Sequence, residues 1–270
     1  MTDQGKYRIY VLFYKTGTVV KNDSLYKPLM AGNALLTEKS DISGDDSGEN
    51  ISNNNLNYSE LTALYWIWKN AQHDVIGACH YRRFFTLRPE PFLYKLKRLL
   101  YYPAGLYRKR HGLIYTKSIG YWRNKLLTVD NINLLLSQYD AVLPQARRLK
   151  YSVEKHYTRY HNTIDLKLVE SILLEKYPEF ITAFHEILHG NRMYANNMFI
   201  LKNNHFQELM GWLFDILFEF ERRVELSKYD GYQQRVMGFI AERLITVWFC
   251  KKKLNVAELP VVYFKKLKYD

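Results

Sequence analysis

The chain has 270 residues, of which 47% are hydrophobic and 16% aromatic, a composition that excludes an intrinsically disordered protein and can form a large core. The formal net charge of +12 favours an anionic partner: a nucleic acid, an acidic lipid or a nucleotide-linked substrate. No apolar run approaches the ~20 residues that cross a membrane, so we expect any membrane contact to be peripheral.

The first segments of the chain predict a strand followed by a long loop. Residues 7–14 are rich in β-branched and aromatic side chains and precede Gly17, which is typical of a strand. Residues 21–36 are ambiguous, with a short helix or a strand near residues 30–36. Residues 40–57 are polar, acidic and glycine-bearing, and long loops of this kind often act as lids or binding loops.

A helix is expected to begin at Asn57. Glu60 lies three residues further on, so the two side chains can form a capping box. Apolar residues then recur at helical spacing and predict the buried face of this helix. Capping is one role for Glu60, and contact with a ligand is the alternative.

Residues 74–79 predict a buried strand that ends in a crowd of polar groups. The apolar run is typical of a strand covered on both faces, and Gly77 indicates a close approach to the backbone. The four residues at its carboxyl end, where open α/β sheets bind ligands, are His80, Tyr81, Arg82 and Arg83. Guanidinium groups donate to phosphate oxygens, so a phosphorylated ligand is favoured over surface ion pairs and core packing.

Residues 91–129 contain no Asp or Glu, and basic residues alternate there with leucines and aromatics. This pattern suits a basic amphipathic insertion that lies on an anionic membrane. The alternative is a solvated basic face whose apolar side packs on the rest of the protein.

The remainder of the chain alternates strands and helices, which predicts an α/β fold. Strands are expected at 139–144, 196–201 and 256–264, and helices at 165–176, 178–188, 206–226 and 230–249. Asp165 and Asp230 suit helix N-caps. We see no internal repeat and no linker, so residues 1–270 are expected to form a single domain.

Residues 185–189 read H-E-x-x-H on a predicted helix. In zinc hydrolases this spacing places two imidazoles, here those of His185 and His189, on one helical face, and the glutamate, here Glu186, activates the metal-bound water. No third ligand is forced by the sequence, although Glu208 is the nearest candidate. The alternative is a pair of half-exposed histidines on an amphipathic helix.

Cysteine use and the N-terminus bear on the compartment. Cys79 and Cys250 lie in apolar surroundings and form no disulfide framework, which suits a reducing cytosol. The chain starts without a signal-peptide pattern. We therefore expect a cytoplasmic protein that binds the inner face of the cell membrane peripherally.

Several spaced motifs, among them NYSELTALYWIWKN at 57–70 and DVIGACHYRRF at 74–84, give the chain a family resemblance. The other matching segments are 50–52, 196–200, 212–219, 229–233 and 242–244. Together they resemble the bacterial capsular and exopolysaccharide glycosyltransferases that were long labelled a domain of unknown function. The resemblance implies a GT-A-like α/β fold and a nucleotide-sugar donor. Some members are galactofuranosyltransferases, so galactofuranose or galactose is the sugar it suggests.

On this resemblance we place the donor site on the matching segments. The donor-binding residues are expected to be His80, Tyr81, Arg82, Arg83, Tyr58, Asn57, Asn196 and Asn197. The commonest GT-A pattern has an Asp-x-Asp that holds a divalent metal, whereas this chain has histidine and arginines at the equivalent place. Arginines can neutralise a diphosphate without a metal. If a metal binds, Asp45 and Asp46 of the loop could be its ligands.

For an inverting transfer, a carboxylate must take the proton from the acceptor hydroxyl. Asp230 is the first candidate, because it precedes Tyr232 at a loop-to-helix junction, although it can equally be an N-cap. Glu242 and Glu60 are the next candidates.

The sequence therefore predicts a glycosyltransferase that moves a sugar from a UDP-sugar onto a growing, lipid-linked polysaccharide. A zinc hydrolase is the rival enzyme, and a basic module that binds membrane or nucleic acid is the rival without catalysis. Nucleic acid is disfavoured, because the basic residues concentrate in one leucine-rich stretch and no nucleic-acid-binding signature appears.

Overall fold

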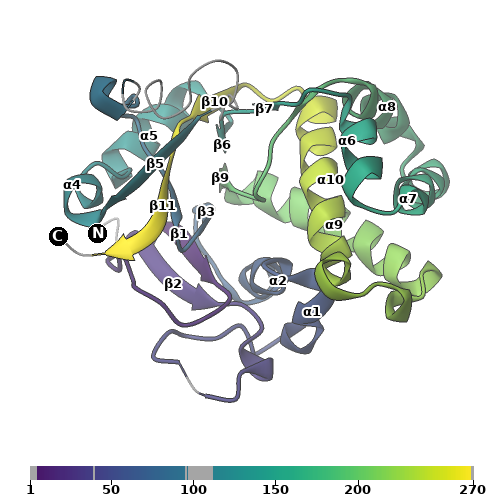
Figure 1. Ribbon diagram of the computed structural model, residues 1–270, viewed down its shortest axis with the longest axis horizontal. Coiled ribbons are helices and arrows are strands. Elements are labelled where there is room, and N and C mark those ends of the chain that lie inside the picture. Colours follow the sequence, from purple (N-terminus) through teal and green to yellow (C-terminus); the bar gives the residue numbers. More distant parts are fainter. Residues whose placement is uncertain (1–4, 39, 95, 97–111, 269–270) are drawn as a thin grey trace.

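The computed structural model describes residues 5–38, 40–94, 96 and 112–268. Within them a curled, nine-stranded sheet lies on one side of the molecule, and most of the long helices gather on the other (Figure 1). The predicted α/β class with a helix-rich C-terminal half is confirmed. Among the described residues, no helix is both long and apolar enough to cross a membrane.

The large sheet has the order β10-β6-β9-β3-β4-β11-β5, and β1 pairs with both β2 and β3. Its strands are β1 (Tyr7–Phe13), β2 (Tyr26–Met30), β3 (Val75–His80), β4 (Arg83–Phe85), β5 (Leu113–Ser118), β6 (Ala141–Pro144), β9 (Phe199–Lys202), β10 (Val256–Leu259) and β11 (Val261–Lys268). β1 runs parallel to β3, and β9 runs antiparallel to both β3 and β6. The carboxyl ends of β1, β3 and β6 therefore point to the same edge. A separate pair is formed by β7 (Arg147–Arg148) and β8 (Arg192–Met193).

The helices α7, α8 and α9 lie close to their predicted positions, whereas α4, α5 and α6 were not predicted. The α-helices are α1 (Asn55–Tyr58), α2 (Leu61–Asn70), α4 (Ile119–Arg123), α5 (Val129–Gln138), α6 (Val153–Tyr160), α7 (Thr163–Lys176), α8 (Ile181–His189), α9 (Asn203–Arg223) and α10 (Val236–Lys252). Short 3-10 turns are η1 (Asn33–Leu35), η2 (Ser52–Asn54), η3 (Pro178–Phe180), η4 (Leu226–Lys228) and η5 (Gly231–Arg235).

The sheet separates two hydrophobic cores. Side chains alternate along a strand, so Tyr10 and Leu12 of β1 join the core with the long helices, whereas Ile9, Val11 and Phe13 join the core with α4 and α5. A Cβ atom at position 77 would lie 3.0 Å from the Ile9 side chain and 3.1 Å from that of Ile200, on the strands either side. This explains the glycine in the middle of β3.

The capping box predicted for Asn57 and Glu60 is wrong. Asn57 lies inside α1, and Ser59 has a left-handed φ of 52°, which ends that helix. The next helix, α2, begins after Glu60 without a side-chain cap. The ambiguous residues 21–36 contain β2 and η1.

Part of the predicted membrane insertion belongs to the body of the protein. Residues 113–118 form β5, the strand at the edge of the sheet beside β11, and Ile114 and Trp122 are buried in the hydrophobic core that contains α4 and α5. In residues 113–123, the alternation of basic and apolar side chains is therefore that of a strand, β5, and a short helix, α4, packed on the sheet. Residues 95 and 97–111 lie outside the described part of the chain. The single-domain assignment stays a prediction.

Two predicted N-caps are also corrected. Asn162, not Asp165, caps α7, because its side chain accepts the backbone N–H of Ile164 at 3.1 Å. Asp230 precedes η5 and makes no side-chain cap hydrogen bond, and α10 begins only at Val236. The last predicted strand is two strands, β10 and β11, separated by Pro260.

Candidate active site

A cleft of about 740 Å³ opens between the edge of the sheet and the C-terminal helices. Its sheet wall comes from the ends of β1 and β3, from residue 147 after β6 and from β11; its helical wall comes from α6, η5 and α10. Among the described residues that line it are five arginines and two carboxylates: Arg82, Arg83, Arg147, Arg235, Arg243, Glu60 and Glu242. Ionic charge in the cleft is therefore predominantly positive.

The predicted strand-end residues all line this cleft. The His80 ring shares a hydrogen bond with the Asn196 carbonyl oxygen, with Nε2 2.5 Å away. Burial lowers the pKa of this imidazole, an effect that the nearby Glu60 carboxylate opposes and the Arg83 charge reinforces. The hydrogen bond that His80 donates through Nε2 ties the end of β3 to the chain before β9.

Arg82 and Arg83 both lie close to one tyrosine ring. Their guanidinium carbons lie 5.3 and 5.2 Å from the centre of the Tyr263 ring, and Arg82 also donates to the Tyr263 hydroxyl at 2.9 Å. Burial lowers the pKa of Arg83, and its Nε is buried with no partner among the described residues. Neither arginine forms an ion pair with a described carboxylate. They are held in place by an aromatic ring, and their charge is not neutralised.

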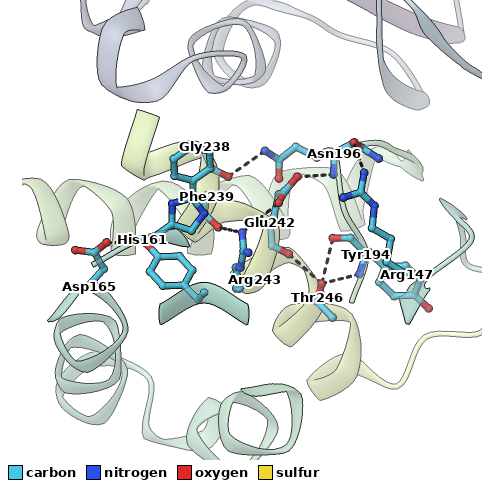
Figure 2. A network of polar contacts seen from close by, with 12 residues as sticks. Arg147, His161, Asp165, Tyr194, Asn196, Gly238, Phe239, Glu242, Arg243 and Thr246 are labelled. Atoms are coloured by element: carbon cyan, nitrogen blue, oxygen red, sulfur yellow. Dashed lines mark hydrogen bonds and ion pairs between the residues drawn. The ribbon is translucent and has the colours of Figure 1, made fainter. Parts of the chain in front are cut away.

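Asn196 connects the two walls of the cleft (Figure 2). Its backbone N–H donates to Glu242 Oε1 at 2.7 Å, and its side-chain oxygen accepts from Arg147 at 3.3 Å. Asn196 and Asn197 have φ of 79° and 48°, a left-handed conformation that asparagine tolerates better than most residues. Such backbone is costly and tends to occur at functional sites.

The two carboxylates of the cleft are each held by a neighbouring amide and an arginine. Glu60 accepts from the Asn197 amide at 2.9 Å and lies 3.4 Å from an Arg235 nitrogen. Burial raises the pKa of Glu60, but the charges of His80 and Arg235 outweigh it and lower the pKa overall. Glu242 lies 3.1 Å from Arg243 and is the more exposed of the two, at 22% against 14% of the side chain.

The helical wall is aromatic. Tyr160 and Tyr232 are 57% and 63% exposed, and both line the cleft. Behind them the His161 ring stacks on Phe239 at 4.1 Å, and Tyr232 lies 5.0 Å from the same Phe239 ring. Burial lowers the pKa of His161, and the charge of the buried Arg243 acts in the same direction. This wall therefore presents uncharged rings to a ligand.

Some sequence-predicted residues lie outside the cleft. Tyr58 is fully buried and donates to Glu221 at 2.8 Å, and the Asn57 amide donates to the Gln234 carbonyl at 3.1 Å. Neither lines the cleft, so their side chains are not placed to bind a donor there. Asn197 reaches the site through Glu60. Asp230 is exposed and outside the lining, although its neighbours Gly231 and Tyr232 belong to it.

The two aspartates proposed as metal ligands have a structural role. Asp45 is fully buried and accepts from Ser52 at 2.5 Å and from the backbone N–H groups of Gly32 and Asn33, each at 3.0 Å. Asp46 accepts from the Asn33 amide at 2.9 Å. Neither lines the cleft. The carboxylates of Asp45 and Asp46 are therefore engaged in hydrogen bonds within the loop.

The H-E-x-x-H residues lie on α8, as predicted, but outside the cleft. His185 is hydrogen-bonded to Glu170 at 2.5 Å, and the His185 and His189 rings stack 5.9 Å apart. Glu208, the suggested third ligand, pairs instead with Lys252. Within the described part of the chain, no group of three or more His, Cys, Asp or Glu residues could hold a metal ion.

Arg147 was not predicted from the sequence, although the rule that ligands bind at the carboxyl ends of strands could have identified it. It follows β6, which runs parallel to β3, so its position matches that of Arg82 and Arg83 at the sheet edge. Arg243 had no comparable signal, because it lies on an apolar helix and is 3% exposed. Tyr263 of β11 was also missed, since nothing in the sequence shows which strand lies beside β4.

Comparison with known proteins places the chain in a family. A family model described as "Domain of unknown function (DUF4422)" matches residues 8–253. The chain belongs to the DUF4422 family. The match confirms the family recognised from the spaced motifs, and it covers the cleft-lining residues of both walls except Tyr263.

A solved structure of the WbbM bifunctional glycosyltransferase, in its apo form, is similar to this DUF4422 chain. The two are 28% identical with a TM-score of 0.84, and the match covers 97% of this chain. It covers 46% of the WbbM chain, so this chain spans about half the length of that protein. No curated protein sequence matches the chain.

Proposed function

We propose that this protein is a glycosyltransferase that moves a sugar from a UDP-sugar to a hydroxyl group of a growing glycan. The observation that carries the proposal is the cleft, where unneutralised arginines on the sheet wall face an aromatic helical wall across two carboxylates. The similarity to a bifunctional glycosyltransferase supports the same reaction class. Galactofuranose or galactose is the sugar that the family resemblance suggests.

The sheet wall is proposed to bind the donor diphosphate. Arg82 and Arg83 follow β3 and Arg147 follows β6, which is separated from β3 by β9, and the three form no ion pair with a described carboxylate. Guanidinium groups in a partly buried site stabilise the negative charge that develops on a departing diphosphate. In this proposal the three arginines supply the charge that a metal supplies in the commonest GT-A enzymes.

Glu242 is proposed as the base of an inverting transfer. The acceptor oxygen would attack the anomeric carbon and lose its proton to Glu242, while the bond to the diphosphate breaks and its electron pair leaves with the diphosphate. Glu242 is preferred over Glu60, because a lowered pKa makes Glu60 a weaker base. It is preferred over Asp230, which does not line the cleft.

Finer assignments extend the proposal. A GT-A type of nucleotide-binding fold, a lipid-linked polysaccharide acceptor and a place at the inner face of an anionic membrane all follow from the resemblance and from the basic composition. The membrane role of residues 91–129 stays a prediction, because much of that run lies outside the described residues.

The test is a panel of nucleotides and nucleotide sugars measured by thermal shift, since a ligand that binds the native state raises the melting temperature. We expect UDP and its sugars to raise it more than GDP or CMP sugars. The same panel on a folded Arg83→Ala variant should give a smaller shift. If no nucleotide changes the melting temperature of the wild-type protein, the proposed donor class is wrong.

A further inference from the structure

A compact group of cations surrounds Tyr151, just before α6. The Lys150 and Lys155 ammonium groups lie 5.3 and 5.1 Å from the centre of the Tyr151 ring, and the Arg159 guanidinium carbon lies 5.6 Å from it. Hydrogen bonds from Lys150 and Arg159 lower the pKa of the Tyr151 hydroxyl. Three like charges therefore share a small exposed area around one aromatic ring.

These cations differ from several others in the helical half in that no described carboxylate pairs with them. Lys176 pairs with Asp215, Arg222 with Glu219, and Lys228 with Glu225. By contrast, in the part of the chain that the structure describes, Lys150, Lys155 and Arg159 form no ion pair. The adjacent exposed cations Arg148 and Lys167 form none either. Unbalanced charge of this density favours an anionic partner.

Apolar side chains are also exposed in the same stretch of the chain. Tyr160, the last residue of α6, is 57% exposed, and Ile164, in the first turn of α7, is 65% exposed. Lys167 follows Ile164 by one helical turn and is also exposed. Glu154 is the one exposed acid between residues 148 and 167, since Asp165 is buried.

We propose that the exposed face of residues 148–167 docks on an anionic phospholipid surface. Cations of this face can lie among the lipid phosphates, while Tyr160 and Ile164 enter the interface between headgroups and acyl chains. A soluble polyanion would match the charge but would gain nothing from an exposed isoleucine, which favours the lipid. Tyr160 also lines the cleft, so the mouth of the cleft would open beside the membrane.

The experiment is flotation with phosphatidylcholine vesicles that contain or lack phosphatidylglycerol, at low and high salt, and it requires no sugar substrate. We expect binding to the anionic vesicles that salt weakens, because these charges are screened. Replacing Lys150, Lys155 and Arg159 together by Gln should lower the partition coefficient by about 10²-fold, because each basic residue near the surface contributes a factor of roughly five. Ile164→Ser should lower it by a further factor of about five.

Two control variants carry the same loss of charge. A triple Gln variant of the exposed Lys202, Arg222 and Lys228, which lie in β9, α9 and η4, should bind the vesicles almost as well as the wild type. A triple Gln variant of Lys117, Arg123 and Lys125 tests the rival surface within residues 91–129. Melting temperatures establish that each variant is folded.

The proposal is overturned if the wild type does not bind anionic vesicles, or if either control variant loses as much binding as the variant at 150, 155 and 159. It is also overturned if Ile164→Ser leaves vesicle binding unchanged while polyphosphate competes fully, because the partner is then a soluble polyanion. None of these results bears on sugar transfer, so the glycosyltransferase proposal is tested separately.

Discussion

The two walls of the cleft are built by different kinds of chain segment, and they differ in whether their arginines are paired with carboxylates. On the sheet wall, Arg82 and Arg83 lie at the end of a buried strand and pair with no described carboxylate. On the helical wall, Arg235 and Arg243 pair with Glu60 and Glu242. A charge that is already balanced attracts an anion weakly, whereas an unbalanced one attracts it strongly.

This difference suggests a division of labour. The sheet wall is suited to a diphosphate, and the helical wall, with Tyr232 exposed, is suited to the apolar face of a sugar ring. Glu242 lies between them and is joined through Asn196 to Arg147 of the sheet wall. The variants below should separate donor binding, proton transfer and acceptor binding if the division is correct.

The largest effect is expected for Glu242→Gln. The amide keeps an oxygen for the Asn196 N–H but cannot take a proton, so transfer should fall by roughly 10²–10⁴-fold. Donor binding and melting temperature should change little, because the sheet wall is intact. The measurement is initial rates of sugar transfer beside nucleotide affinity for the same protein.

Asp230→Asn is the matched control for that variant. Asp230 is exposed and makes no cap hydrogen bond, so we expect near-normal transfer. If instead Asp230→Asn loses activity and Glu242→Gln retains it, the base is Asp230, the first candidate from the sequence. Loss in neither variant would move the role to Glu60.

The next effect concerns the sheet wall. Arg83→Ala should weaken nucleotide binding by about 1.5–3 kcal/mol, the usual contribution of a hydrogen bond to a charged group. Isothermal titration with UDP measures it directly. Arg88→Ala removes an exposed arginine outside the cleft and should leave the affinity unchanged. Equal losses in both variants would mean that the effect is one of net charge.

A smaller effect is expected on the helical wall. Tyr232→Ala removes an exposed ring, and aromatic contacts of this kind contribute about 0.5–1.5 kcal/mol. The KM for the glycan acceptor should therefore rise by roughly two- to tenfold, while UDP affinity stays the same. If Tyr232→Ala weakens UDP binding and leaves the acceptor KM unchanged, the two walls have been assigned the wrong way round.

The sequence predicted the sheet wall better than the helical wall for a physical reason. Residues 80–83 follow an apolar run whose length sets where the strand ends, and parallel strands bring such ends to one edge. Arg147 obeys the same rule and could have been included. These positions depend on local pattern and on the direction of the strands.

The helical wall depends on contacts that no local pattern encodes. Asp230 was predicted to open a helix, but Gly231 has φ of 48° and the next turn is a 3-10 turn, so α10 begins six residues later. That shift takes Asp230 out of the lining and leaves Glu242 as the carboxylate that α10 presents. Likewise, the left-handed Ser59 separates two helices and turns Glu60 from an expected cap into a cleft residue.

The smallest effect concerns Asp165, which supports the helical wall from behind. Its carboxylate accepts from the Tyr157 hydroxyl at 2.7 Å and from the Tyr229 hydroxyl at 2.5 Å, which joins α6 and the chain before η5 to α7. Burial raises the pKa of Asp165 above its ordinary 3.8 by more than these two hydrogen bonds lower it. The folded protein therefore holds this proton more tightly than the unfolded chain does.

The sign of the pH dependence follows from that shift. The stabilising contribution of protonated Asp165 is complete below pH 3.8 and is lost as the pH rises through the raised pKa of the folded state. Asp165→Asn does not titrate, so the free energy of unfolding of the wild type, relative to this variant, should fall between pH 3.8 and neutrality. Urea unfolding at a series of pH values measures the difference. Tyr229→Phe removes one of the hydrogen bonds that lower the pKa, so its loss of stability with rising pH should be steeper. If the wild type instead gains stability over this range relative to Asp165→Asn, the tyrosine hydrogen bonds outweigh burial, and the helical wall is held by an ionised carboxylate.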